Sequence, residues 1–510
     1  MKGAPNLATR QSSPFSQTLT GVVALVSVYA LVHGVARLLA SGNLGEDDPF
    51  DNLLIQQLAA GYRSNQPPLY DWLLWLLQQG LGAGVMPFLL LKYALLVVIA
   101  GFLFSITRRV SGSALWGLLA VDAMALVYQI FWRFHEGFTH RVGAITLALA
   151  TLWALLRLID HGRRRDYLVL GVCIGLGLLS EGRYAVLLIA LLAAAALQPQ
   201  ARARLRSPWL VLVPLSVALI VSPYAYWLLA DPARLEGLAA FWSVPAQAQV
   251  GYALLHALTF PVLVLSPYIF ILPLLFPTLV RTLWRQTPLR PNPARPFAAD
   301  QFILHVLLLQ WAWLVVVDGL LRRHADYAVH GLLPMFVIAL VWLTEKTRQA
   351  APTPRQIRRF VVFSLVITAV AFGGRLANMF VLDPVCTTCR WGVPYAGLAG
   401  AMRAAGFEGG VVLSPEVELA GNLRRFFPKD AFIVPGAGGL PPSSEQVVPV
   451  AIVWPARQDE KAVFDSLRGY LPPTYHGALP VHEIRIPWRH LWKPDGYRHS
   501  DWRLVVVPAR

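Results

Sequence analysis

Three consecutive carboxylates, Glu46, Asp47 and Asp48, closely follow an apolar stretch that ends at Ala40. Like charges repel one another, and a low dielectric constant near the edge of a bilayer increases that cost. Such a cluster is expected where it binds a cation or accepts a proton. A carboxylate whose pKa is raised by burial or by neighbouring charges can act as a general base toward a hydroxyl group. The alternative is a structural role, in which Asp47 or Asp48 caps a helix with Pro49 at its first helical position.

A second polar stretch contains Glu136 between Arg133 and Arg141. Glu136 could position a substrate, but an ion pair with either arginine is the simpler interpretation because such pairs are common and weak. Tyr62 also has two interpretations. Its ring could stack on a sugar, or it could belong to the aromatic belt found at membrane interfaces.

The sequence predicts no metal site from spacing alone. His135 and His140 flank Glu136, but their spacing does not match a recognised zinc pattern. The sequence leaves open whether Asp47 and Asp48 bind a divalent cation, because hard cations prefer carboxylate ligands. No other cofactor is indicated by these residues.

Cations that could bind a phosphate are few outside the basic loops. Arg322 and Arg323 are the main candidates, and His330 follows them as a candidate substrate contact. The planar fork of arginine suits phosphate oxygens. The alternative is that both arginines reach toward lipid headgroups. Arg183 and Lys92 are secondary candidates, and for Lys92 the headgroup interpretation is the simpler one.

The composition predicts the elements that must position these residues. Of the 510 residues, 56% are hydrophobic and 14% are charged, whereas a soluble domain has about 25% charged residues. The net charge of +16 does not indicate nucleic-acid binding, because Lys and Arg occupy short loops between apolar runs. The sequence therefore predicts a polytopic α-helical membrane protein.

Apolar runs bounded by charges predict about eleven spans at about 20 residues each. Their approximate limits are 19–40, 83–107, 113–131, 141–159, 167–181, 184–198, 208–230, 253–280, 301–320, 329–344 and 360–380. Basic residues occur in alternate loops, which predicts a cytoplasmic N-terminus. Residues 1–380 are then the membrane domain, and residues 381–510 lie on the outer side.

Residues 381–510 have the texture of a small α/β domain. Short β-like runs alternate with helical stretches. The predicted strands are residues 410–413, 431–434, 448–454 and 503–507, and the predicted helices are residues 395–405 and 458–470. Cys386 and Cys389 precede them, and a local disulfide is expected if this segment faces an oxidising compartment. No cleavable signal peptide is evident, because the first apolar run is long enough to remain as a span.

The first polar loop resembles the corresponding loop of the GT-C membrane glycosyltransferases. The closest branch is the protein O-mannosyltransferase-like group, which includes the aminoarabinose transferases of lipid A. The resemblance rests on an acidic pair, a Gly-Tyr pair and a Pro-Pro-Leu motif, here Asp47-Asp48, Gly61-Tyr62, Pro67-Pro68-Leu69 and Trp72. It implies that Asp47 is the catalytic base. Asp48 stands where the family usually has Glu, and Pro49 where a small residue is commoner.

The resemblance continues more weakly to the end of the chain. Residues 178–184 are similar to a Ser-Lys-Tyr-like stretch of the family, with Arg183 in the basic position, and residues 398–424 are similar to the outer domain of bacterial members. The family implies a polyprenyl-phosphate sugar donor and an acceptor that is an envelope lipid, a glycan or a protein. It also implies the bacterial inner membrane, with the C-terminal domain in the periplasm.

Two other functions remain open at this point. A transporter or lipid flippase could use charges inside the spans, such as Asp122, Asp318 and His33. Against it, the sequence shows no inverted repeat. A scaffold that binds envelope lipids without catalysis is the third interpretation.

Overall fold

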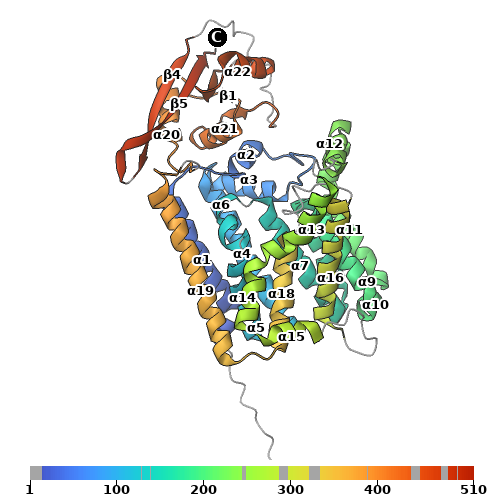
Figure 1. Cartoon of the computed structure of the whole chain (residues 1–510). Helices are drawn as coiled ribbons and strands as arrows, with labels where there is room; N and C mark the ends of the chain where they lie inside the picture. The colour runs from blue at the N-terminus through green and yellow to red at the C-terminus, as the bar shows by residue number, and fades with distance from the viewer. Residues whose placement is uncertain are drawn as a thin grey trace, which may run out of the picture.

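The computed structural model describes residues 14–127, 129–137, 139–243, 249–285, 297–320, 333–386, 389–437, 448–471, 480–490 and 492–509. These residues form a bundle of apolar helices with a small α/β unit stacked on one end (Figure 1). Two short helices, α2 (Asp48–Leu54) and α3 (Leu69–Leu81), lie between the two layers. The acidic segment, defined here as residues 45–51, is therefore placed at their junction.

Six helical segments among the described residues are long and apolar enough to cross a membrane, and up to eight if each of two bent pairs is one span. The six are Leu19–Ala40, Val85–Ser111, His140–His161, Pro208–Leu229, Ala299–Val317 and Pro354–Leu382. The bent pairs are Tyr184–Leu197 with Pro199–Leu205, at 112°, and Val250–Val264 with Tyr268–Leu275, at 48°. The chain is thus a multi-pass membrane protein, as predicted.

Each predicted apolar run coincides with one or more helices, but not every helix has the length of a span. Helices α8 (Arg164–Ser180) and α18 (Leu333–Gln349) have 17 residues each, and α5 (Ala114–Asp122) has nine. An α-helix rises 1.5 Å per residue, so nine residues cover less than half of a bilayer core about 30 Å thick. The predicted number of eleven therefore includes runs that the structure divides or shortens.

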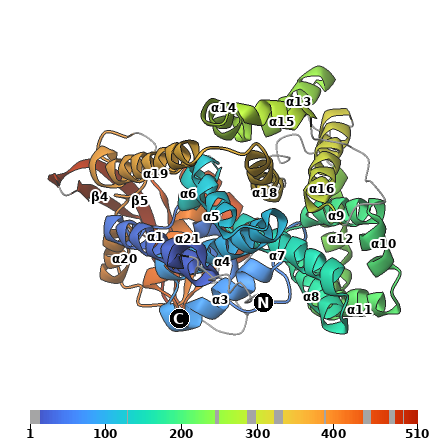
Figure 2. The same ribbon diagram turned by 90° about the horizontal axis from the view of Figure 1, so that it is seen from below.

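Helix α4 (Val85–Ser111) packs against α1 (Leu19–Ala40), α5, α7 (His140–His161) and α18 (Figure 2). Its buried side chains, among them Phe88, Leu96 and Leu103, belong to one continuous hydrophobic core. The remaining helices are α6 (Phe134–Gly137), α9 (Tyr184–Leu197), α10 (Pro199–Leu205), α11 (Leu212–Leu229), α12 (Pro232–Ser243), α13 (Val250–Val264), α14 (Ser266–Leu275), α15 (Thr278–Arg285), α16 (Ala299–Trp313) and α19 (Pro354–Ala377).

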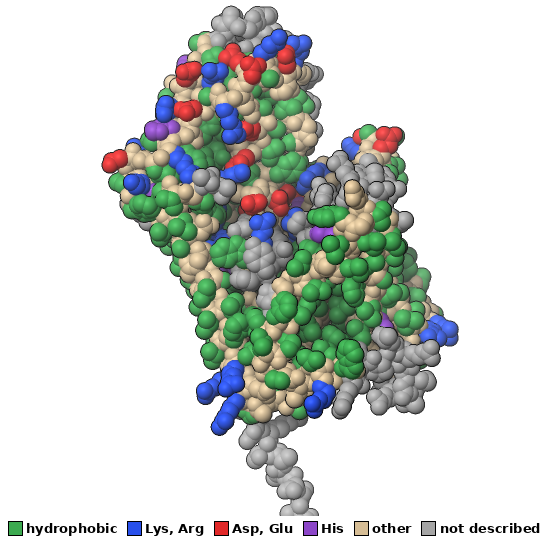
Figure 3. All heavy atoms as spheres, in the orientation of Figure 1, with side chains coloured by type: hydrophobic (Ala, Val, Ile, Leu, Met, Phe, Trp, Pro, Cys, Tyr) green, Lys and Arg blue, Asp and Glu red, His purple; other side chains and the backbone are tan. Residues whose placement is uncertain are grey.

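Charge is distributed unevenly along the bundle (Figure 3). Lys and Arg side chains gather at the end opposite the α/β unit, a hydrophobic surface follows, and the α/β unit carries Asp and Glu together with further Lys and Arg. Ion pairs at the basic end, Arg109 with Asp160 at 2.6 Å and Lys346 with Asp300 at 2.9 Å, join neighbouring helices. This grouping agrees with the predicted alternation of basic loops.

The α/β unit contains a five-stranded sheet in the order β2-β1-β3-β5-β4. Strand β1 pairs in parallel with β2 and β3, whereas β5 is antiparallel to β3 and β4. The strands are β1 (Val411–Leu413), β2 (Ala431–Ile433), β3 (Val450–Pro455), β4 (His482–His490) and β5 (Lys493–Val507). All four predicted strands occur, and the long hairpin formed by β4 and the first part of β5 was not predicted.

Two cores cover the two faces of this sheet, because successive residues of a strand point to opposite sides. Val412 faces a core that includes α20 (Tyr395–Ala404) and α21 (Val417–Leu423), and Leu413 faces one that includes α22 (Glu460–Leu467). Leu53 of α2 belongs to the first core. Helix α2 is therefore packed into the α/β unit although it belongs to the first polar loop.

Candidate active site

Asp47 occupies the N-cap position of α2, but its carboxylate makes no capping hydrogen bond. The preceding residue, Glu46, has a φ of 55°, a left-handed conformation that non-glycine residues seldom adopt. Pro49 lies in the first turn, as predicted. The carboxylate of Asp47 is exposed and is not used as a cap, so the structural interpretation of this residue is not supported.

The surroundings of Asp47 favour its protonated form. Although the residue is exposed, protein packs closely enough around it for restricted hydration to raise the pKa of its carboxyl group, and the charges of Asp51 and Glu46 act in the same direction. Arg141 is the strongest charge acting on Asp47 and opposes this rise. A raised pKa is what a carboxylate needs to act as a general base near neutral pH.

Asp48 has a different environment although it is the next residue. It is buried, with 4% exposure, and burial raises its pKa to about 7. The strongest charge that acts against this rise is Lys92, which is also buried, with 1% exposure. The interpretation of Lys92 as a residue that reaches toward lipid headgroups is therefore wrong, because its ammonium group lies inside the protein near Asp48.

Gly137 allows the second polar stretch to approach the acidic segment. A Cβ atom on Gly137 would lie 2.1 Å from the Cβ of Glu46 and 3.4 Å from the backbone nitrogen of Asp47. The helix that carries Glu136 is thus packed against Asp47, while the Glu136 side chain itself lies outside the described residues. Arg322, Arg323 and His330 also lie outside the described residues.

Arg183 forms an ion pair with Glu181, with a distance of 3.6 Å between Nη1 and Oε1. Burial raises the pKa of Glu181, and Arg141 is among the charges that oppose this rise. The structure thus brings the predicted Arg183 and the acidic segment to the same side of the bundle, joined through Arg141. Arg141 was considered in the sequence only as a partner for Glu136.

The first-loop motifs hold the backbone of this loop. The hydroxyl of Tyr62 donates to the Gln57 carbonyl at 2.8 Å, and Trp72 Nε1 donates to the Ala59 carbonyl at 2.8 Å. A Cβ on Gly61 would lie 2.5 Å from the ring of Trp227, so this position requires glycine. The Tyr62 hydroxyl is therefore already engaged by the loop.

Residues of the α/β unit form hydrogen bonds that fix α2 in place. Arg424 donates hydrogen bonds to the Asn52 carbonyl and, at 3.0 Å, to Gln78 Oε1 of α3. Asn52 Nδ2 in turn donates to the Gly421 carbonyl at 2.8 Å. The neighbouring α3 and the distant segment 421–424 thereby fix the helix that begins at Asp48.

Two further features bear on ligands. Asp51, Asp71 and His140 each bring one potential metal-ligand atom within 4.8 Å of the others.

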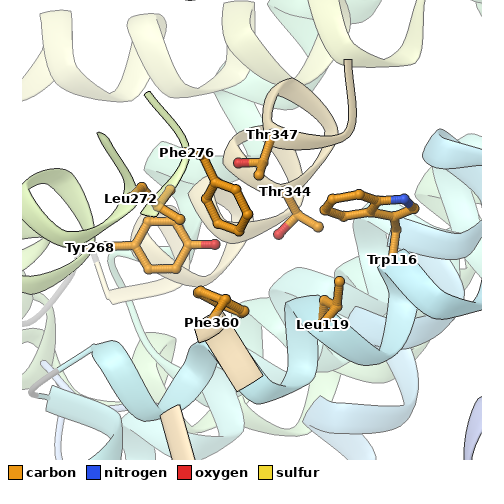
Figure 4. A pocket seen from close by; sticks show the side chains of 8 residues that line it. All are labelled: Trp116, Leu119, Tyr268, Leu272, Phe276, Thr344, Thr347 and Phe360. Carbon is orange, nitrogen blue, oxygen red and sulfur yellow. The ribbon is translucent and has the colours of Figure 1, made fainter. Parts of the chain in front are cut away.

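A small pocket between α5, α14, α18 and the start of α19 is apolar apart from a few hydroxyl groups (Figure 4). It is lined by Trp116, Leu119, Tyr268, Leu272, Phe276, Thr344, Thr347 and Phe360. None of the candidate catalytic residues lines this pocket.

Comparison with known proteins points to one family. A family profile described as dolichyl-phosphate-mannose-protein mannosyltransferase matches residues 65–227. The lipopolysaccharide core galacturonosyltransferase RgtA of Rhizobium johnstonii is 25% identical over 488 residues, which cover 92% of this chain and 93% of RgtA. RgtB of the same organism is 26% identical over 86% of this chain and 87% of RgtB.

Solved structures show the same fold. ArnT from Cupriavidus metallidurans bound to undecaprenyl phosphate superposes with a TM-score of 0.60 at 13% identity, over 95% of this chain and 98% of that chain. The apo state of ArnT gives a TM-score of 0.62 at 14% identity with the same coverage.

Cys386 and Cys389 form a disulfide, as predicted for an oxidising compartment.

The relatives are glycosyltransferases by name and cover nearly the whole chain, which favours sugar transfer over the transporter or scaffold alternatives. The first-loop motif, the profile match over residues 65–227 and the fold together make the chain similar to the GT-C membrane glycosyltransferases.

Proposed function

We propose that the chain transfers a sugar from a polyprenyl-phosphate carrier to an envelope acceptor such as a lipopolysaccharide glycan, at the outer face of the bacterial inner membrane. RgtA and RgtB support the acceptor by their names, and the ArnT complex with undecaprenyl phosphate supports the carrier. The observation that carries the proposal is Asp47, an exposed carboxylate with a raised pKa beside Arg141. Because both named relatives transfer galacturonic acid, a galacturonosyl donor is the first to test.

In the proposed step, Asp47 takes the proton from an acceptor hydroxyl group. The hydroxyl oxygen forms a bond to the anomeric carbon on the face opposite the phosphate. The bond between the anomeric carbon and the phosphate oxygen breaks, and the polyprenyl phosphate leaves with the electron pair. The configuration of the sugar is therefore inverted, and the proton passes from Asp47 to water. A phosphate leaving group that is stabilised by nearby cations needs little help from a general acid.

Several cations could meet the phosphate near Asp47. Arg141 exerts the strongest charge effect on Asp47. Arg183, which is paired with Glu181, lies on the same side of the bundle. Arg322 and Arg323 stay predictions for the same role. The positive charge of Lys92 acts on Asp48, so Lys92 would contribute by balancing the charge of that buried carboxylate.

The remaining predictions concern the substrate and the compartment. Glu136 and His330 stay predicted substrate contacts, and Tyr62 could still offer its ring face to a sugar. A divalent cation on Asp47 and Asp48 stays a prediction as well. The basic end of the bundle supports a cytoplasmic N-terminus and a periplasmic α/β unit.

The proposal is tested by replacing Asp47 with Asn, which keeps the size of the side chain and removes the base. Loss of a general base typically costs about 10²–10⁴ in rate. We expect that loss in sugar transfer from undecaprenyl-phosphate galacturonic acid to a lipopolysaccharide core lipid, with the product measured by mass spectrometry. The matched control is Asp465→Asn, which removes an exposed carboxylate of α22 and should keep full activity. Full transfer by Asp47→Asn would show that another group is the base.

A further inference from the structure

A cluster of buried ligand-type side chains begins at the last residue of the acidic segment, Asp51, and none of its members exchanges a proton or forms a bond in the proposed step. Asp51 comes from α2, Asp71 from α3, and His140 is the first residue of α7. The exposed fractions of their side chains are 2%, 2% and 1%. Two carboxylates that are buried this completely need a compensating positive charge.

The distances within the cluster are longer than hydrogen bonds. His140 Nε2 lies 3.3 Å from Asp71 Oδ1 and 3.6 Å from Asp51 Oδ1, whereas N–H···O bonds in proteins are about 2.7–3.2 Å long. Within the described part of the chain, His140 Nε2, Asp71 Oδ1 and Asp51 Oδ2 have no hydrogen-bond partner. Unsatisfied buried polar atoms are rare in native proteins, so those that occur together require a specific explanation.

The two distances from His140 Nε2 are those expected between two ligands of one metal ion, and all three ligand atoms lie within 4.8 Å of one another. A tetrahedral ion with bonds of about 2.0–2.2 Å places its ligand atoms about 3.3–3.6 Å apart. One imidazole nitrogen with two carboxylates is a donor set that suits zinc and neighbouring transition metals, whereas magnesium and calcium prefer oxygen ligands alone.

Arg63 is the one other cation that the described ion pairs place at this cluster, with Nη2 3.9 Å from Asp51 Oδ1. Its guanidinium group is engaged elsewhere, because Nη2 donates to Gln66 Oε1 at 2.7 Å and the group stacks over the ring of Phe50. Arg63 therefore pairs only with Asp51 Oδ1, and Asp51 Oδ2 and Asp71 Oδ1 have no hydrogen-bond partner among the described residues.

We infer that Asp51, Asp71 and His140 bind a divalent transition-metal ion, with Zn²⁺ as the best fit. The ion ties α2 and α3 to the outer end of α7 and so fixes the helix whose N-terminus carries Asp47. This inference does not depend on the proposed sugar transfer. The competing arrangement is a protonated His140 held between two carboxylates, with no metal.

Metal content of the full-length protein separates the two arrangements. The protein is purified in detergent without a polyhistidine tag and without chelator, and its metals are measured by inductively coupled plasma mass spectrometry. We expect about one zinc per chain, and at least a tenfold loss of it in His140→Ala and in Asp71→Asn. The matched control is Asp383→Asn, which alters another fully buried carboxylate, near the α/β unit, and should retain the metal.

A second measurement avoids any variant that fails to fold. Wild-type protein is stripped with chelator and titrated with Co²⁺, which should give the visible absorption of a tetrahedral cobalt site, and Zn²⁺ should then displace the cobalt. Absence of both stoichiometric metal and the cobalt spectrum would overturn the inference, as would unchanged zinc in His140→Ala. Because Asp47→Asn should bind zinc normally, failure of the metal site and failure of the proposed function give different results.

Discussion

At the scale of single residues, the two neighbouring aspartates have separate roles. Asp47 precedes the first turn of α2 and is exposed, whereas Asp48 begins the helix and points into the protein. Each residue of a helix is rotated by about 100° from the last, so adjacent carboxylates at a helix start can face opposite environments. The exposed one can meet a substrate, and the buried one belongs to the charge balance with Lys92.

The raised pKa of Asp47 predicts how sugar transfer depends on pH. Only the deprotonated carboxylate can accept a proton, so the rate falls as the pH falls through this pKa, at a higher pH than about 3.9, the value for an ordinary aspartate. Arg141 lowers the pKa of Asp47, so Arg141→Gln should move the acidic limb of the rate profile to still higher pH. Arg468→Gln, on the α/β unit, should leave the limb in place. An unchanged limb in Arg141→Gln would contradict the assignment of Asp47 as the titrating base.

The buried partner of Asp48 predicts an effect on stability. Lys92→Met removes the main positive charge that acts on Asp48, and breaking a buried pair typically costs about 3–5 kcal/mol of unfolding free energy. We expect the Tm of Lys92→Met to be clearly lower than that of the wild type, with unfolding in detergent monitored by intrinsic fluorescence. Adding Asp48→Asn should recover part of the loss, because the remaining charge is then removed as well. Lys461→Met, at an exposed position of α22, is the control, and an equal Tm for Lys92→Met and this control would contradict the pairing.

At the scale of elements, α2 is positioned by the α/β unit from one side and by the bundle from the other. The contact with α21 is very close, because a Cβ on Gly421 would lie 2.1 Å from the Pro49 carbonyl oxygen. The hydrogen bonds of Arg424 and Asn52 add to this contact. The outer unit therefore sets the orientation of the helix at whose N-terminus the candidate base lies.

Gly421→Ala tests this coupling without touching the proposed catalytic residues. The added methyl group must push α2 away from α21, and a misplacement of about 1 Å at a reacting group can cost about 10²-fold in rate. We expect at least a tenfold loss of sugar transfer with little loss of expressed protein. Gly400→Ala is the matched control, because Gly400 also lies in a helix and no atom is within 4 Å of its added Cβ. Equal activities of the two variants would show that the contact does not position the site.

At the scale of the whole molecule, charge and hydrophobicity divide the protein into three zones (Figure 3). The basic end, the apolar surface and the α/β unit, whose surface carries both acidic and basic side chains, follow one axis, and the positive-inside rule predicts that the basic end is cytoplasmic. The Cys386–Cys389 disulfide lies at the α/β end, where an oxidising compartment is expected.

This division predicts the topology in the membrane. Alkaline phosphatase fused after residue 510 should be active in whole cells, because that enzyme folds in the periplasm, whereas a fusion in the loop at Arg163 to Arg165 should be inactive. Green fluorescent protein at the same two positions should give the opposite pattern. Activity of the phosphatase at the arginine loop would reverse the proposed orientation.

Composition and periodicity were sufficient to predict the helical bundle and most strands of the α/β unit. Burying apolar surface at a regular spacing is a local property, so the sequence displays it directly. The hairpin of β4 and β5 was not predicted, because β4 and the first nine residues of β5 contain no buried residue and carry charges that interrupt the alternation.

The sequence by itself determined the membrane class, the likeness of the first loop to a glycosyltransferase family and Asp47 as the candidate base. Only the tertiary structure decided that Asp48 is buried with Lys92, that Arg141 is the cation beside Asp47, and that His140 meets Asp51 and Asp71. These contacts join segments separated by tens of residues. Spacing along the chain carries no information about them, because they depend on how α2, α3 and α7 pack against one another and against the α/β unit.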